Sequence, residues 1–194
     1  MNLPNKHTIL RIIMIPVFIA LFLYCDSTLG KILCTVVFAL ASFTDFVDGH
    51  IARKYNLVSN FGKFADPLAD KILVLSAMLI LVEAGNLPAW IPIIVLFREF
   101  VVSGYRLIAV EKGGEVIAAN IWGKIKTVTQ MIAIILMFIN INNTNVFGAF
   151  VKGNLEGMPL VINILATVTM LVSVIATIFS GWSYIKNGKD LLKD

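Results

Sequence analysis

The chain has 194 residues, of which 58% are hydrophobic and 14% are charged, and its mean hydropathy is +0.87. These values exclude an ordinary soluble domain, in which about 45–50% of residues are apolar and about 25% are charged. The formal net charge is +4, which we attribute to Lys and Arg residues facing anionic lipid headgroups and not to nucleic-acid binding. The composition therefore predicts an integral membrane protein.

Six apolar stretches long enough to cross a bilayer follow one another along the chain. They cover residues 8–24, 29–51, 64–82, 87–110, 125–139 and 160–185. None shows the period-two alternation of a barrel strand, so we expect an all-α integral membrane protein with six transmembrane helices in one domain, residues 1–194. No cleavage-site pattern follows the first stretch, and we expect it to be retained instead of removed as a signal peptide.

The positions of Lys and Arg predict the direction of these helices. Basic residues gather before the first stretch, between the second and third, between the fourth and fifth, and after the sixth, whereas the opposite ends hold only Lys31 and Lys152. By the positive-inside rule both termini are cytoplasmic. We therefore expect a multi-pass protein of the cell membrane whose loop between the second and third stretches faces the cytoplasm.

Four aspartates stand where the second predicted helix leads into the third, in the sequence DFVDGHIARKYNLVSNFGKFADPLAD, residues 45–70. Continued as a helix, the second stretch carries five of these residues on one face: Asp45, Asp48, Gly49, Ala52 and Arg53. The third helix carries three residues spaced four apart, which form one stripe: Gly62, Asp66 and Asp70. Pro67 predicts a kink or a late helix start. Helices joined by a short turn pack antiparallel, so we expect the four carboxylates to line one small volume.

Such a cluster needs positive charge, because one Asp near the middle of a bilayer costs roughly 2.5–3.5 kcal/mol and neighbouring anions repel. Arg53 and Lys71 are too few to neutralise four aspartates. Hard divalent cations prefer carboxylate oxygens, and Mg²⁺ is commonly held by carboxylates together with substrate phosphates, so we predict a two-metal site. The alternative, small residues for helix packing beside charged loop residues, explains the glycines but not the aspartates.

The spacing D-x2-D-G-x2-A-R-x8-G-x3-D-x3-D resembles the signature of the CDP-alcohol phosphatidyltransferases. The resemblance implies a six-helix, usually homodimeric membrane protein in which a hydroxyl attacks the lipid-linked phosphorus of a CDP-lipid, with CMP leaving. It implies two divalent ions, Mg²⁺ or Mn²⁺, on the diphosphate. Carried over by position, the metal ligands would be Asp45, Asp48, Asp66 and Asp70, with Asp70 also the general base. The residues bordering the nucleotide would be Gly49, Ala52, Arg53 and Gly62.

Basic residues on the fourth and fifth predicted helices bear on the acceptor. Arg98 lies eight residues, about 12 Å of helix, deeper than Arg106, and an arginine at that depth is a functional candidate. Lys124 and Lys126 begin the fifth helix on the same side. Together these four residues predict a pocket for the phosphate of the acceptor. The alternative is that Arg106 and the two lysines only set the topology, and that Arg98 pairs with Glu99 or an aspartate.

Four segments, NLPNKHTILR, DPLADK, FREFVVSGYR and WGKIKT, resemble the branch of this family that joins CDP-diacylglycerol to sn-glycerol 3-phosphate, giving phosphatidylglycerophosphate and CMP. A phosphatidylinositol-phosphate synthase or another acceptor specificity is the alternative within the family, because an inositol phosphate also suits a cationic pocket. A membrane cation transporter is the alternative from another class. Transporters are expected to place their sites near the midplane, whereas the aspartates here lie toward one edge.

Overall fold

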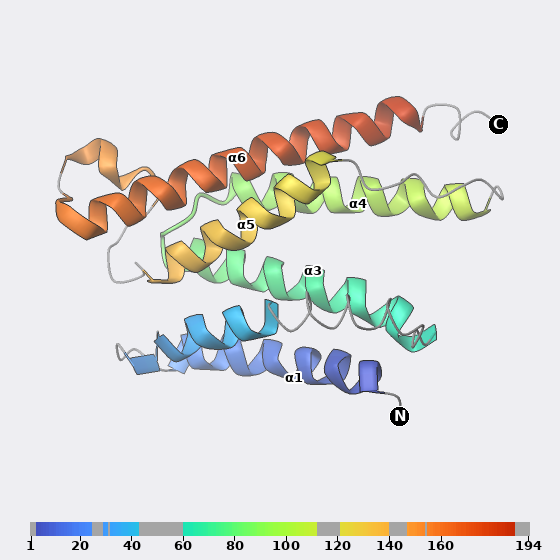
Figure 1. Cartoon of the computed structure of the whole chain (residues 1–194), viewed down its shortest axis with the longest axis horizontal. Coiled ribbons are helices and arrows are strands. Elements are labelled where there is room, and N and C mark those ends of the chain that lie inside the picture. Colours follow the sequence, from blue (N-terminus) through green and yellow to red (C-terminus); the bar gives the residue numbers. More distant parts are fainter. Residues whose placement is uncertain are drawn as a thin grey trace.

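The computed structural model describes residues 3–24, 29–30, 32–42, 60–111, 121–139, 147–153 and 155–188. The named elements are α1 (Leu3–Tyr24), α3 (Asn60–Glu83), α4 (Trp90–Glu111), α5 (Ile121–Ile139), the 3-10 helix η1 (Ala149–Lys152) and α6 (Gly157–Asn187) (Figure 1). A further helical segment, Ile32–Ser42, lies within the second predicted stretch. The described residues contain no strand, and the all-α prediction is confirmed for them.

Two of these helices, Ile121–Ile139 and Gly157–Lys186, are long and apolar enough to cross a membrane by length and composition, and the segments Ile12–Tyr24 and Ile32–Ser42 are shorter apolar helices. Helices α3 and α4 do not meet this criterion, because every 18-residue window in them holds more than two charged residues. Those charges include the aspartates and arginines of the predicted site. The helices are consistent with a membrane protein, and six spans with cytoplasmic termini stay a prediction.

Helix α3 runs without interruption through the residues that carry the second aspartate stripe. It begins at Asn60, and Pro67 lies inside it, so the expectation of a late helix start is wrong. Proline removes one backbone hydrogen bond from the helix, and this 24-residue helix continues on both sides of it. Asp66 and Asp70 therefore stand one turn apart on a single helix, as their spacing predicts.

The helices pack around a shared apolar core. Helix α6 contacts α5 and α4, and α3 contacts α1, α5 and α4. Three aromatic rings, those of Phe18, Phe38 and Phe138, meet with centroids 5.5 to 5.8 Å apart and join three segments of the chain. On the outside, large apolar side chains such as Phe97 and Trp182 are 68% and 65% exposed. Apolar surface of this kind is expected where a helix faces lipid.

The bundle has two distinct ends. In Figure 1 the starts of α1 and α3 and the ends of α4 and α6 lie together at one end, which we call the terminal end. The opposite end, which we call the loop end, holds the turn between α3 and α4 and the 3-10 helix η1. The start of α1 and the end of α6 thus lie at the same end of the bundle, and the cytoplasmic orientation of this end stays a prediction.

Neutral hydrogen bonds hold the segment around η1 to its neighbours at the loop end. The backbone N–H of Gly148 donates to Thr167 Oγ1 over 3.1 Å, and that of Phe150 donates to Asn163 Oδ1 over 3.0 Å. Thr167 and Asn163 lie one turn apart on α6, and both are buried. Gly148 has a φ of 71°, a left-handed conformation that favours glycine. The loop end is therefore fastened to α6 by side chains that satisfy backbone donors.

Candidate active site

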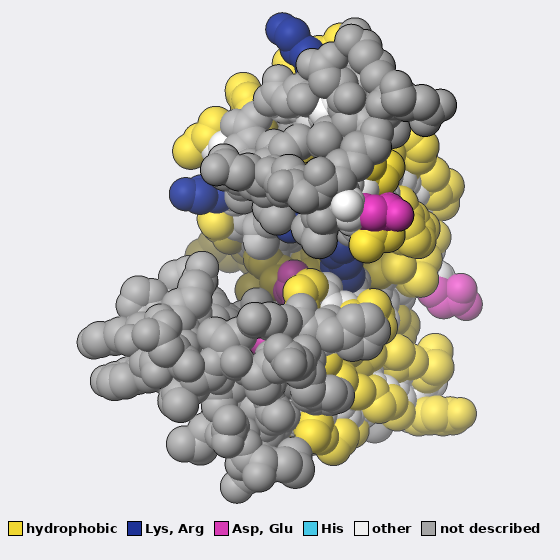
Figure 2. All heavy atoms as spheres, turned by 90° about the vertical axis from the view of Figure 1, so that its right-hand side faces the viewer, with side chains coloured by type: hydrophobic (Ala, Val, Ile, Leu, Met, Phe, Trp, Pro, Cys, Tyr) yellow, Lys and Arg dark blue, Asp and Glu magenta, His cyan; other side chains and the backbone are white. Residues whose placement is uncertain are grey.

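A cavity of about 580 Å³ lies between α3, α4 and α5, toward the terminal end. Its charged lining residues come from all three helices: Asp70 and Lys71 from α3, Arg98, Glu99 and Arg106 from α4, and Lys126 from α5. Much of the remaining lining is apolar, and the volume falls in the range of about 300–1,000 Å³ that is usual for small-molecule sites. Viewed from the terminal end, basic and acidic side chains lie close together near the middle of the face (Figure 2). Packing therefore brings a predicted carboxylate and three predicted acceptor cations to one space.

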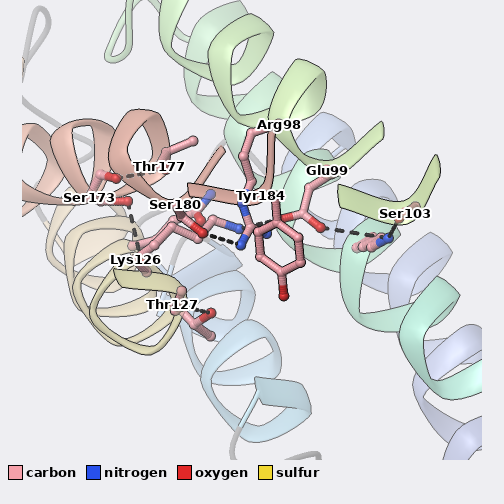
Figure 3. A network of polar contacts seen from close by, with 12 residues as sticks. Arg98, Glu99, Ser103, Lys126, Thr127, Ser173, Thr177, Ser180 and Tyr184 are labelled. Atoms are coloured by element: carbon pink, nitrogen blue, oxygen red, sulfur yellow. Dashed lines mark hydrogen bonds and ion pairs between the residues drawn. The ribbon is translucent and has the colours of Figure 1, made fainter. Parts of the chain in front are cut away.

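Glu99 is the centre of the charge cluster in this cavity. Its Oε1 accepts hydrogen bonds from Arg98 Nη1 and from Lys126 Nζ, both over 2.8 Å (Figure 3). Its Oε2 lies 3.6 Å from Lys71 Nζ, and that ammonium group donates to Ser103 Oγ over 2.6 Å. The predicted alternative that Arg98 pairs with Glu99 is confirmed. Because three cations surround one carboxylate, the cluster retains an excess of positive charge facing the cavity.

The members of the cluster differ in their exposure. The side chains of Lys126, Arg98 and Glu99 are 9%, 12% and 18% exposed, whereas that of Lys71 is 39% exposed. Removing one partner of a buried ion pair leaves the other charge uncompensated, which typically costs about 3–5 kcal/mol. The three buried groups therefore hold one another in place, and Lys71 is the member most open to the cavity.

Helix α6 and two glycines shape the place where Arg98 is held. Arg98 Nη2 donates to Ser180 Oγ over 2.6 Å, and its guanidinium carbon lies 5.9 Å from the centroid of the Tyr184 ring, within cation–π range. A Cβ added at Gly123 would lie 3.3 Å from Nη2, and one at Gly181 would lie 3.4 Å from Cγ. The missing side chain at Gly123 therefore gives the guanidinium group room, whereas a Cβ at Gly181 would make an ordinary van der Waals contact with Arg98.

Sequence reasoning did not identify the contribution of α6. The hydroxyl group of Tyr184, a residue that is 2% exposed, accepts a hydrogen bond from Arg106 Nη2 over 3.0 Å. The guanidinium carbon of Arg106 lies 5.8 Å from the centroid of the Tyr184 ring. The available signal was the short polar and small segment SGWSY, residues 180–184, within an otherwise apolar helix. Small polar residues in such a helix indicate close contact with a neighbouring helix. Here they contact the two arginines of α4.

The remaining predicted acceptor residue, Lys124, occupies a different position from the other three. Its side chain is exposed, and it is not among the residues that line the cavity. Lys126, two positions further along α5, is buried and lines the cavity. Since two positions correspond to about 200° around a helix, the two lysines point away from each other. The cavity thus brings together Arg98, Arg106 and Lys126, and leaves Lys124 on the surface of α5.

The aspartates of the predicted metal site are described in part. Asp66 and Asp70 are both half-buried on α3, and Asp70 lines the cavity, while Gly62 lies one turn before Asp66 in the same helix. The other predicted residues, Asp45, Asp48, Gly49, Ala52 and Arg53, lie outside the described residues. Within the described part of the chain, no group of three or more His, Cys, Asp or Glu side chains could hold a metal ion. The two described carboxylates supply oxygen donors one turn apart, which fits half of the predicted ligand set for a hard cation.

Comparisons with known proteins show which family the sequence resembles along nearly its whole length. The family model described as CDP-alcohol phosphatidyltransferase matches residues 1–182. A Bacillus subtilis protein named CDP-diacylglycerol--glycerol-3-phosphate 3-phosphatidyltransferase is 41% identical, with 99% of this chain and 97% of the relative covered. Proteins of the same name from Rickettsia typhi and Haemophilus influenzae are 37% and 33% identical, covering 95% and 100% of this chain and 96% of each relative.

Proposed function

The chain belongs to the CDP-alcohol phosphatidyltransferase family, and from this membership we propose that it transfers the phosphatidyl group of CDP-diacylglycerol to sn-glycerol 3-phosphate. The products are phosphatidylglycerophosphate and CMP. Relatives that carry the name of this activity align along nearly their whole length. The observation that carries the proposal is the cavity that is lined both by Asp70 and by a cluster with excess positive charge.

The charge cluster suits the acceptor. Glycerol 3-phosphate carries a phosphate that is doubly or singly negative near neutral pH, and guanidinium and ammonium groups bind such phosphates through charge-assisted hydrogen bonds. We propose that Arg98, Arg106, Lys124 and Lys126 supply the positive charge that attracts this phosphate. Because the cavity is largely apolar around Arg98, Arg106 and Lys126, their attraction for an anion is stronger than it would be in water. Lys124 lies on the surface of α5, outside this lining.

Asp70 suits the hydroxyl end of the acceptor. A carboxylate within hydrogen-bond reach of a hydroxyl can take its proton as general base. The acceptor oxygen then forms a bond to the lipid-linked phosphorus, the bond from that phosphorus to the CMP oxygen breaks, and the proton of the hydroxyl passes to Asp70. The cytidine nucleotide of the donor is proposed to be bordered by Gly49, Ala52, Arg53 and Gly62.

The family is generally dependent on divalent metal ions, and we propose two ions, Mg²⁺ or Mn²⁺, held by Asp45, Asp48, Asp66 and Asp70. Asp66 and Asp70 fit this role, since both are carboxylates one turn apart and Asp70 lines the cavity. When bound, such ions neutralise charge on the diphosphate and stabilise the leaving CMP. The four aspartates would hold these ions, and Asp70 would also receive the proton of the acceptor hydroxyl.

The proposed setting is the cell membrane. The apolar helices and the family support a membrane protein, and we propose a multi-pass protein with six spans, cytoplasmic termini and a site that faces the cytoplasm. Membrane lipids would surround the exposed apolar side chains, and the active form is proposed to be a homodimer. A cytoplasmic site has access to a soluble acceptor while the acyl chains of the donor stay in the bilayer.

Identification of the lipid product tests this function. The purified protein is given CDP-diacylglycerol, Mg²⁺ and, separately, glycerol 3-phosphate, inositol phosphate, serine and glycerol, and the lipid product and released CMP are measured. We expect phosphatidylglycerophosphate and CMP in equal amounts with glycerol 3-phosphate only. A phosphatidylinositol phosphate product would reassign the acceptor, and cation flux into liposomes without CMP release would replace the enzyme by a transporter.

A further inference from the structure

Lys71 combines three features that the two buried cations of the cluster, Arg98 and Lys126, do not share. It follows Asp70 directly on α3 and lines the same cavity. Its ammonium group donates to Ser103 Oγ over 2.6 Å, yet lies 3.6 Å from Glu99 Oε2, longer than a hydrogen bond. Its side chain is 39% exposed. Lys71 is thus held near the cluster by a neutral hydroxyl and only loosely by a charge.

The two more deeply buried cations are held much more firmly. Arg98 and Lys126 each donate to Glu99 Oε1 over 2.8 Å, and Arg98 has a second bond to Ser180. If either turned toward a ligand, it would leave a mostly buried carboxylate with less compensation, which is costly. These groups are therefore suited to maintaining a fixed positive field and poorly suited to following a substrate.

We propose that Lys71 is an acceptor-binding residue that contacts the phosphate of the acceptor directly, while Glu99, Arg98 and Lys126 form a fixed scaffold behind it. This assignment rests on the proposed function. An ammonium group has three N–H donors, and Lys71 directs one of them to Ser103 Oγ. The remaining donors can bind phosphate oxygens without breaking a buried pair.

The position of Lys71 also bears on acceptor specificity. Lys71 and Asp70 are neighbours in sequence and line one cavity. The ammonium group proposed to bind the phosphate and the carboxylate proposed to receive the hydroxyl proton therefore belong to adjacent residues. In glycerol 3-phosphate a three-carbon chain joins the phosphate to the reacting hydroxyl. A short phosphorylated acceptor can therefore reach both groups at once, whereas an unphosphorylated alcohol would lose the anchor at Lys71.

Steady-state kinetics on three variants test this role. In Lys71→Ala we expect the KM for glycerol 3-phosphate to rise about ten- to hundredfold, with the KM for CDP-diacylglycerol changed by less than about twofold, because the lost charge-assisted bond is made to the acceptor alone. Lys71→Arg should recover part of this loss. The control Lys186→Ala removes an exposed lysine in the last turn of α6 and should leave both KM values unchanged.

Three results would overturn the assignment: an unchanged KM for glycerol 3-phosphate, an equal rise in both KM values, or a fall in kcat alone. A changed Mg²⁺ concentration for half-maximal activity would also overturn it, because Lys71 would then act through the neighbouring carboxylate. Calorimetric binding of glycerol 3-phosphate to the wild-type protein and to Lys71→Ala does not require turnover. Weaker binding of glycerol 3-phosphate by the variant would support a contact between Lys71 and the acceptor. Absence of a lipid product with the wild-type protein would contradict the proposed function and leave this contact supported.

Discussion

The two ends of the bundle solve the problem of buried polar groups in different ways. Toward the terminal end, Glu99 forms close ion pairs with Arg98 and Lys126 and a longer one with Lys71, beside the cavity. At the loop end, Asn163 and other neutral side chains of α6 accept hydrogen bonds from backbone N–H groups around η1. The buried polar groups of the cluster beside the cavity are charged, whereas those that hold η1 are neutral.

This difference indicates which buried polar groups are retained for a reason other than the stability of the fold. A neutral side chain that satisfies a backbone donor contributes to stability at modest cost, whereas a buried ion pair often contributes no more than an apolar replacement of similar volume. Since the charged cluster faces a cavity, we attribute its presence to ligand binding. The neutral hydrogen bonds at the loop end have a structural role, and substitutions at the two ends should therefore affect different measurements.

The largest expected effect is the loss of turnover when a proposed metal ligand loses its charge. Asp70→Asn, Asp66→Asn and Asp45→Asn should each lower kcat by about a thousandfold or more, because Asn cannot act as general base and is a weaker ligand for a hard cation. Membrane localisation should not change. CMP release and membrane fractionation measure the two quantities, and retained activity in any two variants would refute the two-metal assignment.

A smaller but substantial effect is expected from Arg98→Ala. The substitution removes one charge from the scaffold and leaves the mostly buried Glu99 with one close partner fewer, so the KM for glycerol 3-phosphate should rise about tenfold or more. The KM for the CDP-lipid should rise less. Kinetics with each substrate varied in turn measure the two KM values separately. An equal rise in both would contradict a role of Arg98 in acceptor binding.

Gly123→Ala tests how closely the scaffold is packed. The added Cβ would lie 3.3 Å from Arg98 Nη2, so the guanidinium group must move by a few tenths of an ångström, and we expect a loss of about 1 kcal/mol, or roughly fivefold in kcat/KM for glycerol 3-phosphate. The matched control is Gly104→Ala on α4, where nothing lies within 4 Å of the added Cβ. Equal kinetics in the two variants would show that this packing does not matter for activity.

The smallest catalytic effect is expected at the loop end. Asn163→Ala removes the acceptor of the Phe150 N–H, and it should lower the free energy of unfolding by about 1–2 kcal/mol while leaving both KM values unchanged. Thr169→Ala is the control, because that hydroxyl bonds to the carbonyl of Leu165 within its own helix and its removal should cost less. Thermal unfolding in detergent measures the difference, and an altered KM in Asn163→Ala would show that the two ends are coupled.

Much of the architecture could be predicted from local patterns. Within the described residues the apolar stretches correspond to helices, because a segment in lipid must satisfy its backbone hydrogen bonds internally. The spacing of Asp66 and Asp70 places them on one stripe because the helix repeats every 3.6 residues. The signature around these aspartates also led to the family that the comparisons support. The nucleotide-bordering residues and half of the metal ligands stay predictions, since they lie outside the described residues.

The pairing of charges across helices did not follow from these patterns. Lys126 and Glu99 are 27 positions apart, and Arg98 and Ser180 are 82 apart, so no periodicity within one helix relates them. Their contact depends on how far each helix is rotated about its own axis and on how closely neighbouring helices approach. Side chains from several helices determine both quantities together, and the missing side chain at Gly123 is part of that packing. Residue types and spacing thus specify which groups are available for chemistry, and only the packing of the bundle specifies which of them meet.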